Sequence, residues 1–434
     1  MKTTIVILGL AGVVAAVHGH AQAMFRGDAA HSGIYAEKGP RDFHRVKWTF
    51  PTGGRIVSSP VTLDGVIYFG SDDGSVYAVE AGSGRQVWRR GTNGPVSATP
   101  AVTGGVVYVG SYDGKFYALD ARTGAPKWKF VTGGERQFEA KGIHGWLPKN
   151  QTIPDPFDLY LSSPVVVNGT VYFGSGDGNL YALDAGSGEL RWKFAAGDVV
   201  HASPAYADGV VYVGSWDSYL YAVDATNGKE KWRFHGGEDP LIHNQVGFQS
   251  SPAVADGVVY TGCRDSNLYA IDAATGKEKW RFNNNGSWVI ASPAVKDGKV
   301  FFTTSDSALY HVVDAVTGKA VLRQEGKAFM FSSPAIAGDV VYVGVTNGTL
   351  EARDSATGKL LWDFQTEASK QNPGWVLTAD RKFNNSLLFR STWQAPVIEA
   401  TYRMFRVGSI FSSPLIAGGA VYFGSTDGNL YAIE

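Results

Sequence analysis

The stretch Ser58–Trp88, SSPVTLDGVIYFGSDDGSVYAVEAGSGRQVW, decides the fold because the chain repeats it. Ala98–Trp128 reads ATPAVTGGVVYVGSYDGKFYALDARTGAPKW, with the same turns and the same final tryptophan. A repeat of about forty residues that contains several short strands is typical of a propeller blade. The sequence therefore predicts an all-β fold made of copies of one unit.

Tight turns divide each unit into four strands. In the first unit, Asp64-Gly65 and Asp73-Gly74 separate apolar β-rich runs, which is the strongest short hairpin signal. We interpret the repeated Asp residues as turn formers rather than calcium ligands. The proline that opens each unit fits an innermost strand whose free edge faces a channel. The eight prolines are Pro60, Pro100, Pro164, Pro204, Pro252, Pro293, Pro334 and Pro414.

The last unit stops at Glu434 without a fourth strand, and the N-terminal region supplies a matching one. Lys47–Phe50 resembles Lys127–Phe130, and the interval from Trp48 to Pro60 equals that from Trp88 to Pro100. We therefore predict an eight-bladed β-propeller of four-stranded antiparallel blades. The first strand completes the last blade and closes the ring.

Residues 1–23 resemble a secretory signal peptide, with Lys2, an apolar centre at 5–17 and an Ala21-Gln22-Ala23 cleavage motif. The apolar run is too short for a membrane span, and no lipidation cysteine follows the motif. The formal net charge of −1, without runs of like charge, argues against nucleic-acid binding. We expect a monomeric single-domain propeller over 24–434, periplasmic or secreted.

Longer intervals between tryptophan and the next proline reveal three insertions, at about 131–160, 235–248 and 365–410. All three join the last strand of one blade to the first strand of the next. In an antiparallel blade these connections emerge on one face, so that face carries the long loops. Long loops on a rigid scaffold commonly carry function.

The recurrent Ala-x-Asp-x-x-Thr-Gly-x-x-x-Trp pattern, seen at 118–128 and 270–280, resembles the tryptophan-docking motif of pyrroloquinoline-quinone (PQQ) type β-propellers. The opening Met24–Gly33 segment also looks like the start of that family. The resemblance implies that one tryptophan per blade docks against its neighbour. These residues are Trp48, Trp88, Trp128, Trp192, Trp232, Trp280 and Trp362, with Leu322 in the sixth blade.

The family resemblance leaves two functional branches open. Quinoprotein dehydrogenases hold PQQ, usually with Ca²⁺, at the axis, whereas BamB-like members are non-enzymatic scaffolds of outer-membrane protein assembly. The single cysteine, Cys263, excludes the adjacent cysteine pair that many of the dehydrogenases carry. We interpret Cys263 as a small buried hydrophobe. No catalytic residue can be assigned, although Glu135 or Glu139 would be the candidate bases if PQQ bound.

The candidate binding residues lie in the insertions and around the channel mouth. Insertion one and the largest insertion combine charges with aromatics, including Trp375, Asp380, Arg390 and Trp393 in the latter, and either could instead be an ordered structural cap. Positions just before each first strand, and the turns after each second strand, should surround the mouth and resemble a small-molecule site. The candidates are Arg136, Glu139, Lys141, His144, Trp146, His201, Trp216, Gln249, Arg264 and Arg381.

Enzyme motifs are otherwise missing from the sequence: the histidines show no metal-ligand spacing in the mature chain, and there is no Gly-x-Ser-x-Gly elbow. The leading hypothesis is a scaffold that binds an envelope protein or a small-molecule ligand through the insertion-bearing face. The alternatives are a PQQ- and Ca²⁺-dependent oxidoreductase of alcohols or sugars, and a sensor for a cell-wall polymer.

Overall fold

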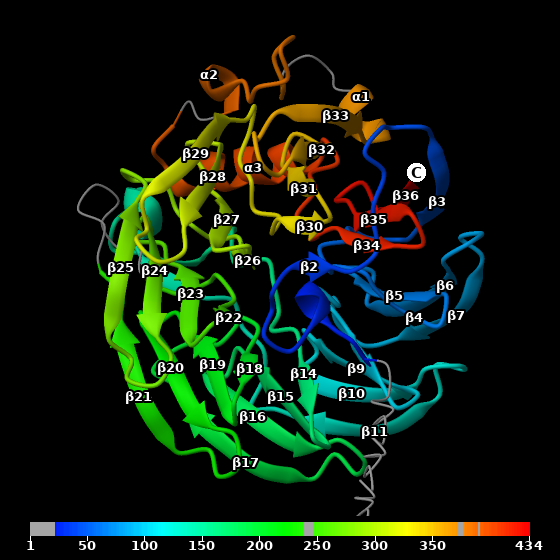
Figure 1. The fold of residues 1–434 in the computed structure, drawn as a ribbon, viewed down its shortest axis with the longest axis vertical. Helices are drawn as coiled ribbons and strands as arrows, with labels where there is room; N and C mark the ends of the chain where they lie inside the picture. The colour runs from blue at the N-terminus through cyan, green and yellow to red at the C-terminus, as the bar shows by residue number, and fades with distance from the viewer. Residues whose placement is uncertain (1–21, 238–246, 372–375, 389–390) are drawn as a thin grey trace, which may run out of the picture.

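The computed structural model describes residues 22–237, 247–371, 376–388 and 391–434. Eight antiparallel sheets surround a central axis (Figure 1), which confirms the predicted eight-bladed propeller. Each blade runs from a three-residue inner strand to a longer outer strand. The first four blades are β4–β7 (Val61–Leu63, Val66–Ser71, Ser75–Glu80, Gln86–Gly91), β8–β11 (Ala101–Thr103, Val106–Ser111, Lys115–Asp120, Pro126–Val131), β14–β17 (Val165–Val167, Thr170–Gly174, Asn179–Asp184, Leu190–Ala195) and β18–β21 (Ala205–Ala207, Val210–Gly214, Tyr219–Asp224, Glu230–His235).

The remaining blades follow the same order, and the last one recruits a strand from the other end of the chain. They are β22–β25 (Ala253–Ala255, Val258–Gly262, Asn267–Asp272, Glu278–Asn283), β26–β29 (Ala294–Lys296, Lys299–Thr303, Leu309–Asp314, Ala320–Glu325), β30–β33 (Ala335–Ala337, Val340–Val345, Thr349–Asp354, Leu360–Gln365) and β34–β36 (Leu415–Ala417, Ala420–Gly424, Asn429–Ile433) with β3 (Val46–Pro51).

The two ends of the chain close the ring as predicted. β3 pairs antiparallel with β36, with Trp48 opposite Ala432 and Phe50 opposite Leu430. The backbone N–H of Arg45 also donates to the carbonyl oxygen of Glu434 over 2.8 Å. Figure 1 shows β3 beside the C-terminus, so the ring is closed by pairing between the first and last strands of the propeller.

The tryptophans dock between blades, because a large indole fills the gap that widens toward the rim. Trp88 Nε1 donates to the carbonyl oxygen of Ala121 in the next blade over 2.8 Å. Gly124, at φ +69°, lies against the same indole, and a Cβ there would come within 2.7 Å of it, which explains the glycine of the motif. Trp362 differs, because the next blade has no such turn, and its indole donates to Pro40 instead.

The repeated Asp residues act as structural turn residues. Asp73 accepts hydrogen bonds from the backbone N–H of Ser75, from Gly53 at the end of the neighbouring strand, and from the Tyr77 hydroxyl. The same three-way arrangement recurs at Asp177, which accepts from Asn179, Gly133 and Tyr181. These carboxylates therefore tie their hairpins to the adjacent blade, as do Asp113, Asp217 and Asp265.

The N-terminal segment closes one end of the channel, which the sequence did not indicate. It contains β1 (Gln22–Ala23), the 3₁₀ turn η1 (Phe25–Gly27) and β2 (Ile34–Tyr35), where β1 pairs with β8 and β2 with β30. Between them, the carbonyls of Ala29, Ala30 and Ser32 accept backbone hydrogen bonds from the inner strands of three successive blades. The inner edges of five blades are therefore paired to this segment, contrary to the free edge that the prolines predict. The pairing of β1 with β8 involves Gln22 and Ala23, which belong to the predicted signal peptide, whereas the other four pairings involve residues 29–35 of the predicted mature chain.

Candidate functional site: the insertion-bearing face

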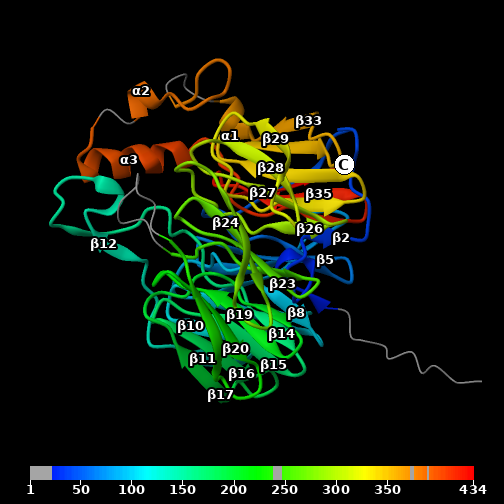
Figure 2. The same cartoon turned by 60° about the vertical axis from the view of Figure 1, so that its left-hand side comes forward.

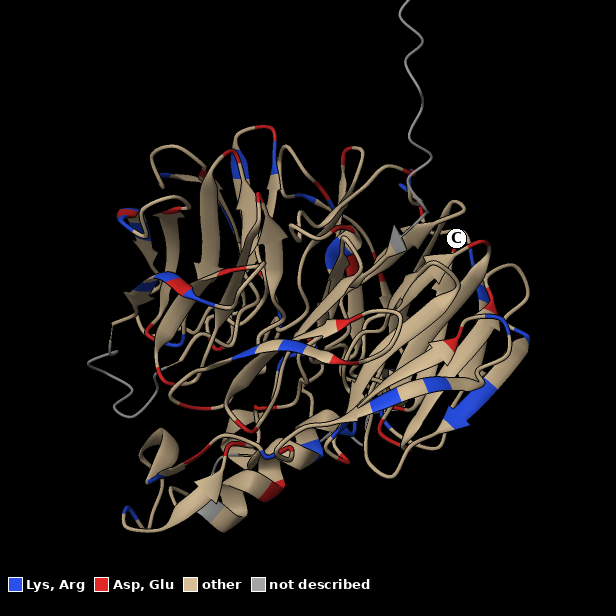
Figure 3. Cartoon of the chain, turned by 90° about the horizontal axis from the view of Figure 1, so that it is seen from below, with Lys and Arg blue, Asp and Glu red and all other residues tan. Residues whose placement is uncertain are grey.

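The first and third insertions gather on the face opposite the N-terminal segment (Figure 2). Insertion one contains β12 (Glu139–Lys141), the turn η2 (Ile143–Gly145) and β13 (Thr152–Pro154). The third contains α1 (Glu367–Lys370), α2 (Asn385–Leu388) and α3 (Gln394–Phe405). The two touch where the backbone N–H of Leu147 donates to Thr392 over 2.9 Å. They form one cap beyond a single rim of the blades (Figure 3).

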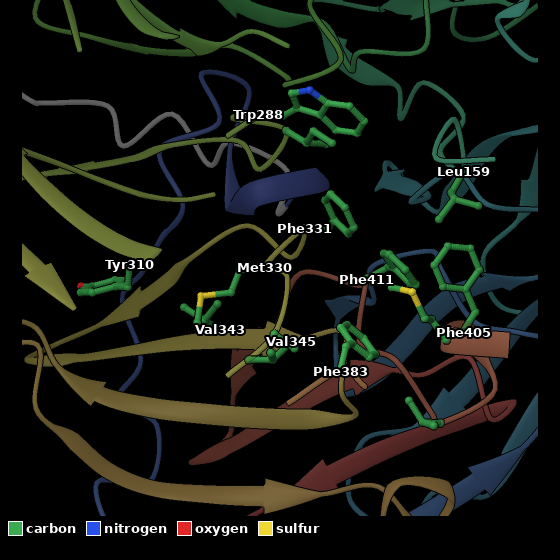
Figure 4. Packing of buried hydrophobic residues seen from close by; sticks show 14 of the residues in the cluster. Leu159, Trp288, Tyr310, Met330, Phe331, Val343, Val345, Phe383, Phe405 and Phe411 are labelled. Atoms are coloured by element: carbon green, nitrogen blue, oxygen red, sulfur yellow. The ribbon is translucent and has the colours of Figure 1, made fainter. Parts of the chain in front are cut away.

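Insertion one ends inside the mouth of the axial channel. The Tyr160 hydroxyl reaches across it and lies 3.2 Å from the carbonyl oxygen of Phe411. Leu159 is buried in the core cluster that also contains Phe331, Phe405 and Phe411, and Figure 4 shows these side chains turned toward one another. The funnel at this mouth is therefore filled by the protein's own apolar side chains.

A ring of hydroxyls lines what remains of the channel. In seven of the eight Ser/Ala–Ser/Thr–Pro motifs, the second residue accepts a backbone hydrogen bond from the preceding blade, as in Ser163 N–H to Ser203 Oγ over 2.9 Å. Seven such links are present among the described residues. They join Ser59 to Thr99, Thr99 to Ser163, Ser163 to Ser203, Ser203 to Ser251, Ser292 to Ser333, Ser333 to Ser413 and Ser413 to Ser59. The hydroxyls surround a cavity of about 30 Å³ that also touches Phe25 and Tyr160.

A buried ion pair anchors insertion one to the fifth blade. Asp155, 0% exposed, pairs with the guanidinium of Arg264, whose side chain is 1% exposed. That guanidinium lies between two indoles, 4.2 Å from the ring centre of Trp216 and 4.4 Å from that of Trp288. It also donates to Gln249 Oε1 over 2.7 Å. Arg264 thus has both faces and several of its N–H donors occupied within the protein.

The charge of Asp155 is stabilised within this cluster. Burial opposes its ionisation, but Arg264 and His144, the latter with Nε2 3.2 Å from Oδ1, outweigh burial and hold the pKa of Asp155 well below its usual range. His144 in turn packs on Trp146, with ring centres 4.5 Å apart. The cluster is a closed electrostatic network rather than a set of groups presented to a ligand.

A second buried network holds insertion one to the fourth blade. His201 Nδ1 lies 2.8 Å from Asp158 Oδ1, and its Nε2 lies 3.5 Å from Glu135 Oε2. Glu135 also accepts from Ser175 Oγ and from the backbone N–H of Gly176, each over 2.6 Å. Burial favours neutral His201, but Asp158 and Glu135 outweigh it and raise the pKa of His201 to about 10. At neutral pH His201 is therefore positively charged and holds insertion one to the fourth blade through Asp158 and Glu135.

The structure brings together only part of the candidate set. His144, Trp146, His201, Trp216, Gln249 and Arg264 form the buried networks beneath insertion one. Glu139, Lys141 and Arg136 lie on its exposed surface. Arg381 is remote from them and pairs with Asp363 in the seventh blade. Trp375 and Arg390 lie outside the described residues.

Sequence reasoning missed the carboxylates that complete both networks. Asp155 and Asp158 lie in the segment 154–160, which the sequence analysis did not single out. Nothing in the local pattern indicates that these carboxylates are fully buried, because their partners, Arg264 and His201, come from other blades. The sequence nevertheless contains one signal, because the blade topology places both Arg264 and His201 at the channel mouth.

Two open recesses lie on the outer surface of the same face. One, of about 510 Å³, runs along α3 and touches Arg55, Tyr402, Arg403 and Arg406. The other, of about 390 Å³, lies between the first blades and insertion one. It touches Arg55, Arg136 and Tyr402 and extends inward to Ser97, Tyr112 and Leu159 at the channel mouth. Because both recesses include Arg55 and Tyr402, they are parts of one groove. This surface, rather than the axis, offers room for a ligand or partner.

The axial residues do not fit PQQ. Small-molecule cavities span about 300–1,000 Å³, whereas the enclosed axial space is about 30 Å³. Tyr160 and Leu159 occupy the funnel. The nearby charged groups are already paired, Asp155 with Arg264 and His201 with Asp158. Among the described residues, no group of three or more His, Cys, Asp or Glu side chains is placed to hold a metal ion.

Solved structures of both functional branches resemble this propeller. BamB from Moraxella catarrhalis superposes with a TM-score of 0.64 at 16% identity, covering 90% of this chain and 97% of that one. Quinohemoprotein alcohol dehydrogenase from Comamonas testosteroni superposes with a TM-score of 0.67 at 15% identity, covering 94% of this chain and 80% of that one. At these identities the likeness shows the fold alone.

Sequence comparison, unlike comparison of folds, identifies a family. The outer membrane protein assembly factor BamB of Shewanella oneidensis is 29% identical over 123 residues, which are 24% of this chain and 31% of that protein. This alignment thus spans less than a third of the relative's length. A family model described as outer membrane protein assembly factor BamB matches residues 37–143, 158–287 and 264–383. The chain therefore belongs to this BamB family of PQQ-repeat propellers.

Proposed function

We propose that the protein is an exported, non-enzymatic scaffold that binds other proteins through its insertion-bearing face. The observation that carries this proposal is the occupied axis: insertion one fills the funnel and is fixed there by Asp155–Arg264 and Asp158–His201. On this face the open space lies instead in the groove that includes Tyr402 and Arg55. A surface groove beside the exposed aromatic side chain of Tyr402 is suited to a polypeptide partner.

Location in the bacterial envelope is part of this proposal. The signal-like residues 1–23 and the name of the Shewanella oneidensis relative, an outer membrane protein assembly factor, support it. The helices of the described residues are too short or too polar to cross a membrane. The dehydrogenase alternative lacks a comparable supporting observation, because the axial residues do not fit PQQ.

Site-directed cross-linking tests the proposal. Cys263 is 0% exposed, and burial raises the pKa of its thiol, so a newly introduced surface cysteine can be labelled selectively. In the Tyr402→Cys variant, a photo-reactive maleimide attached to the new cysteine lies in the groove. The matched control is Val316→Cys, at a 77% exposed turn on the opposite face.

In envelope extract, Tyr402→Cys should give discrete protein adducts, identified by mass spectrometry, that Val316→Cys does not give. The same adducts from both positions, or none from Tyr402→Cys, would contradict an interaction role for this face. Labelling of the wild-type protein provides the background, which should be negligible while Cys263 remains buried.

A further inference from the structure

The groove on the insertion-bearing face carries a cluster of arginines. We call it the arginine groove and define it by Arg55, Arg136, Tyr402, Arg403 and Arg406. Arg403 and Arg406 come from the last turn of α3 and its end, Arg55 precedes the first blade, and Arg136 begins insertion one. Three distant parts of the chain thus contribute guanidinium groups to one surface.

The accessible charge in this groove is mostly positive. The side chains of Arg55, Arg136 and Arg403 are 38%, 49% and 44% exposed, and Arg406 is also exposed. The lining carboxylates of Asp72 and Glu135 are only 11% and 7% exposed, and Asp198, 28% exposed, pairs with Arg136 over 2.7 Å. Since the whole chain has a formal net charge of −1, this cluster is a local feature and not a consequence of a basic protein.

The inward carboxylates already have partners. Asp72 accepts from Arg55 Nε over 2.8 Å and from the Ser97 hydroxyl over 3.1 Å. Glu135 is held by Ser175 and Gly176 at the second buried network. Glu399 is the lining carboxylate on the open surface, at 62% exposure, and pairs with Arg403. Arg406 forms no ion pair with any of the described residues.

We infer that the arginine groove binds an acidic, extended segment of a partner protein; this inference rests on the proposed scaffold function. Arginine pairs with carboxylates through two parallel hydrogen bonds, and several pairs along a groove would set the register of a bound strand. Tyr402, 44% exposed and shared by both recesses, offers an aromatic surface for an apolar side chain between the acidic ones.

A polypeptide fits this groove better than a polyphosphate does. The surface alternates arginines with the carboxylate of Glu399, and its inner wall contains Asp72 and Glu135. A nucleic acid or an anionic lipid layer is favoured by an uninterrupted positive surface. Spaced carboxylates of a peptide can instead meet individual guanidinium groups and avoid Glu399.

Fluorescence anisotropy with defined probes tests the inference. The main probe is a labelled peptide of Glu-Leu-Asp-Val repeats, and its matched control replaces Glu and Asp with Gln and Asn. We expect saturable binding of the acidic peptide that weakens several-fold as salt is raised, with at least tenfold weaker binding of the neutral peptide.

Protein variants test whether binding depends on the arginines of the groove or on any exposed arginine. The triple variant Arg55→Gln, Arg403→Gln, Arg406→Gln should weaken binding of the acidic peptide at least tenfold. Arg122→Gln removes an exposed arginine on the opposite face and should leave binding unchanged. Thermal unfolding checks that each variant is folded, and the single variant Arg406→Gln should give a smaller loss if the triple variant is unstable.

Three results would overturn the inference: equal binding of acidic and neutral peptides, no effect of the groove substitutions in folded protein, or tighter binding of single-stranded DNA or phosphatidylglycerol vesicles. The cross-linking experiment distinguishes this failure from failure of the scaffold role. If Tyr402→Cys captures specific proteins while the acidic peptide does not bind, the charge assignment is wrong and the scaffold function stands.

Discussion

Asp155 and Arg264 form a fully buried ion pair that joins insertion one to the fifth blade across the channel mouth. The two residues are far apart in sequence, and the guanidinium between Trp216 and Trp288 is held on both faces. Insertion one is therefore part of the propeller core, although it is a long connection between blades. Its removal would expose the axis and leave several buried charges without partners.

Breaking this pair should destabilise the protein strongly. Asp155→Asn leaves Arg264 buried without a counter-charge, and loss of one partner of such a pair lowers the free energy of unfolding by about 3–5 kcal/mol. Urea unfolding followed by tryptophan fluorescence measures the loss. Asp155→Asn with Arg264→Met should lose less than Asp155→Asn alone, because the methionine can pack between the indoles without a charge.

The matched control is the exposed pair Arg85–Glu80, with side chains 71% and 36% exposed. Arg85→Gln should barely change the unfolding midpoint, because solvent screens this pair. An Asp155→Asn variant as stable as Arg85→Gln would show that insertion one is not anchored through Arg264.

The architecture was predictable because its signals are local and repeated. Hairpin turns, the proline spacing and the match of Lys47–Phe50 to later outer strands all report on neighbouring strands within one blade. The sequence also predicts which connections share a face, because successive antiparallel strands end at opposite faces of the propeller. The position of Trp48 opposite Ala432 follows from the same logic.

The interior of the site was not predictable, because it depends on contacts between blades and insertions. His201 and Arg264 could be placed at the channel mouth, but their pairing with Asp158 and Asp155 depends on how insertion one folds back. The position of Tyr160 in the channel mouth and the closure of the channel by the N-terminal segment could not be predicted for the same reason. Aperiodic segments have no repeat from which to infer their packing.

The hydroxyl ring gives a second stability prediction. Ser203 Oγ accepts from the backbone N–H of Ser163, both in the buried inner wall of the channel. Ser203→Ala leaves this N–H without a partner and should lower the free energy of unfolding by about 1–3 kcal/mol. Ser203→Thr keeps an acceptor, as Thr99 does naturally in the second blade, and should restore most of the loss. Thermal and urea unfolding of the two variants make the comparison.

The closed axis predicts that PQQ does not bind there. Purified protein titrated with PQQ in the presence of Ca²⁺ should show no saturable absorbance change and no dye reduction with alcohols or sugars. Tyr160→Ala enlarges the funnel, and this variant separates exclusion by the plug from lack of recognition. Saturable binding to the wild-type protein that Tyr160→Ala strengthens would mean that insertion one moves aside and that the dehydrogenase hypothesis must be reopened.

His201 makes stability depend on pH in the alkaline range. Its pKa rises from about 6.5 in the unfolded chain to about 10 in the folded protein, so the folded state binds the proton more tightly. The resulting stabilisation is complete below about pH 6.5 and is lost as pH rises toward 10, with a slope of up to about 1.4 kcal/mol per pH unit. His201→Gln should remove this slope, whereas His44→Gln, at an exposed position, should retain it. Urea unfolding at closely spaced pH values compares the three proteins, and parallel curves for wild type and His201→Gln would show that Asp158 and Glu135 do not hold a charged imidazole.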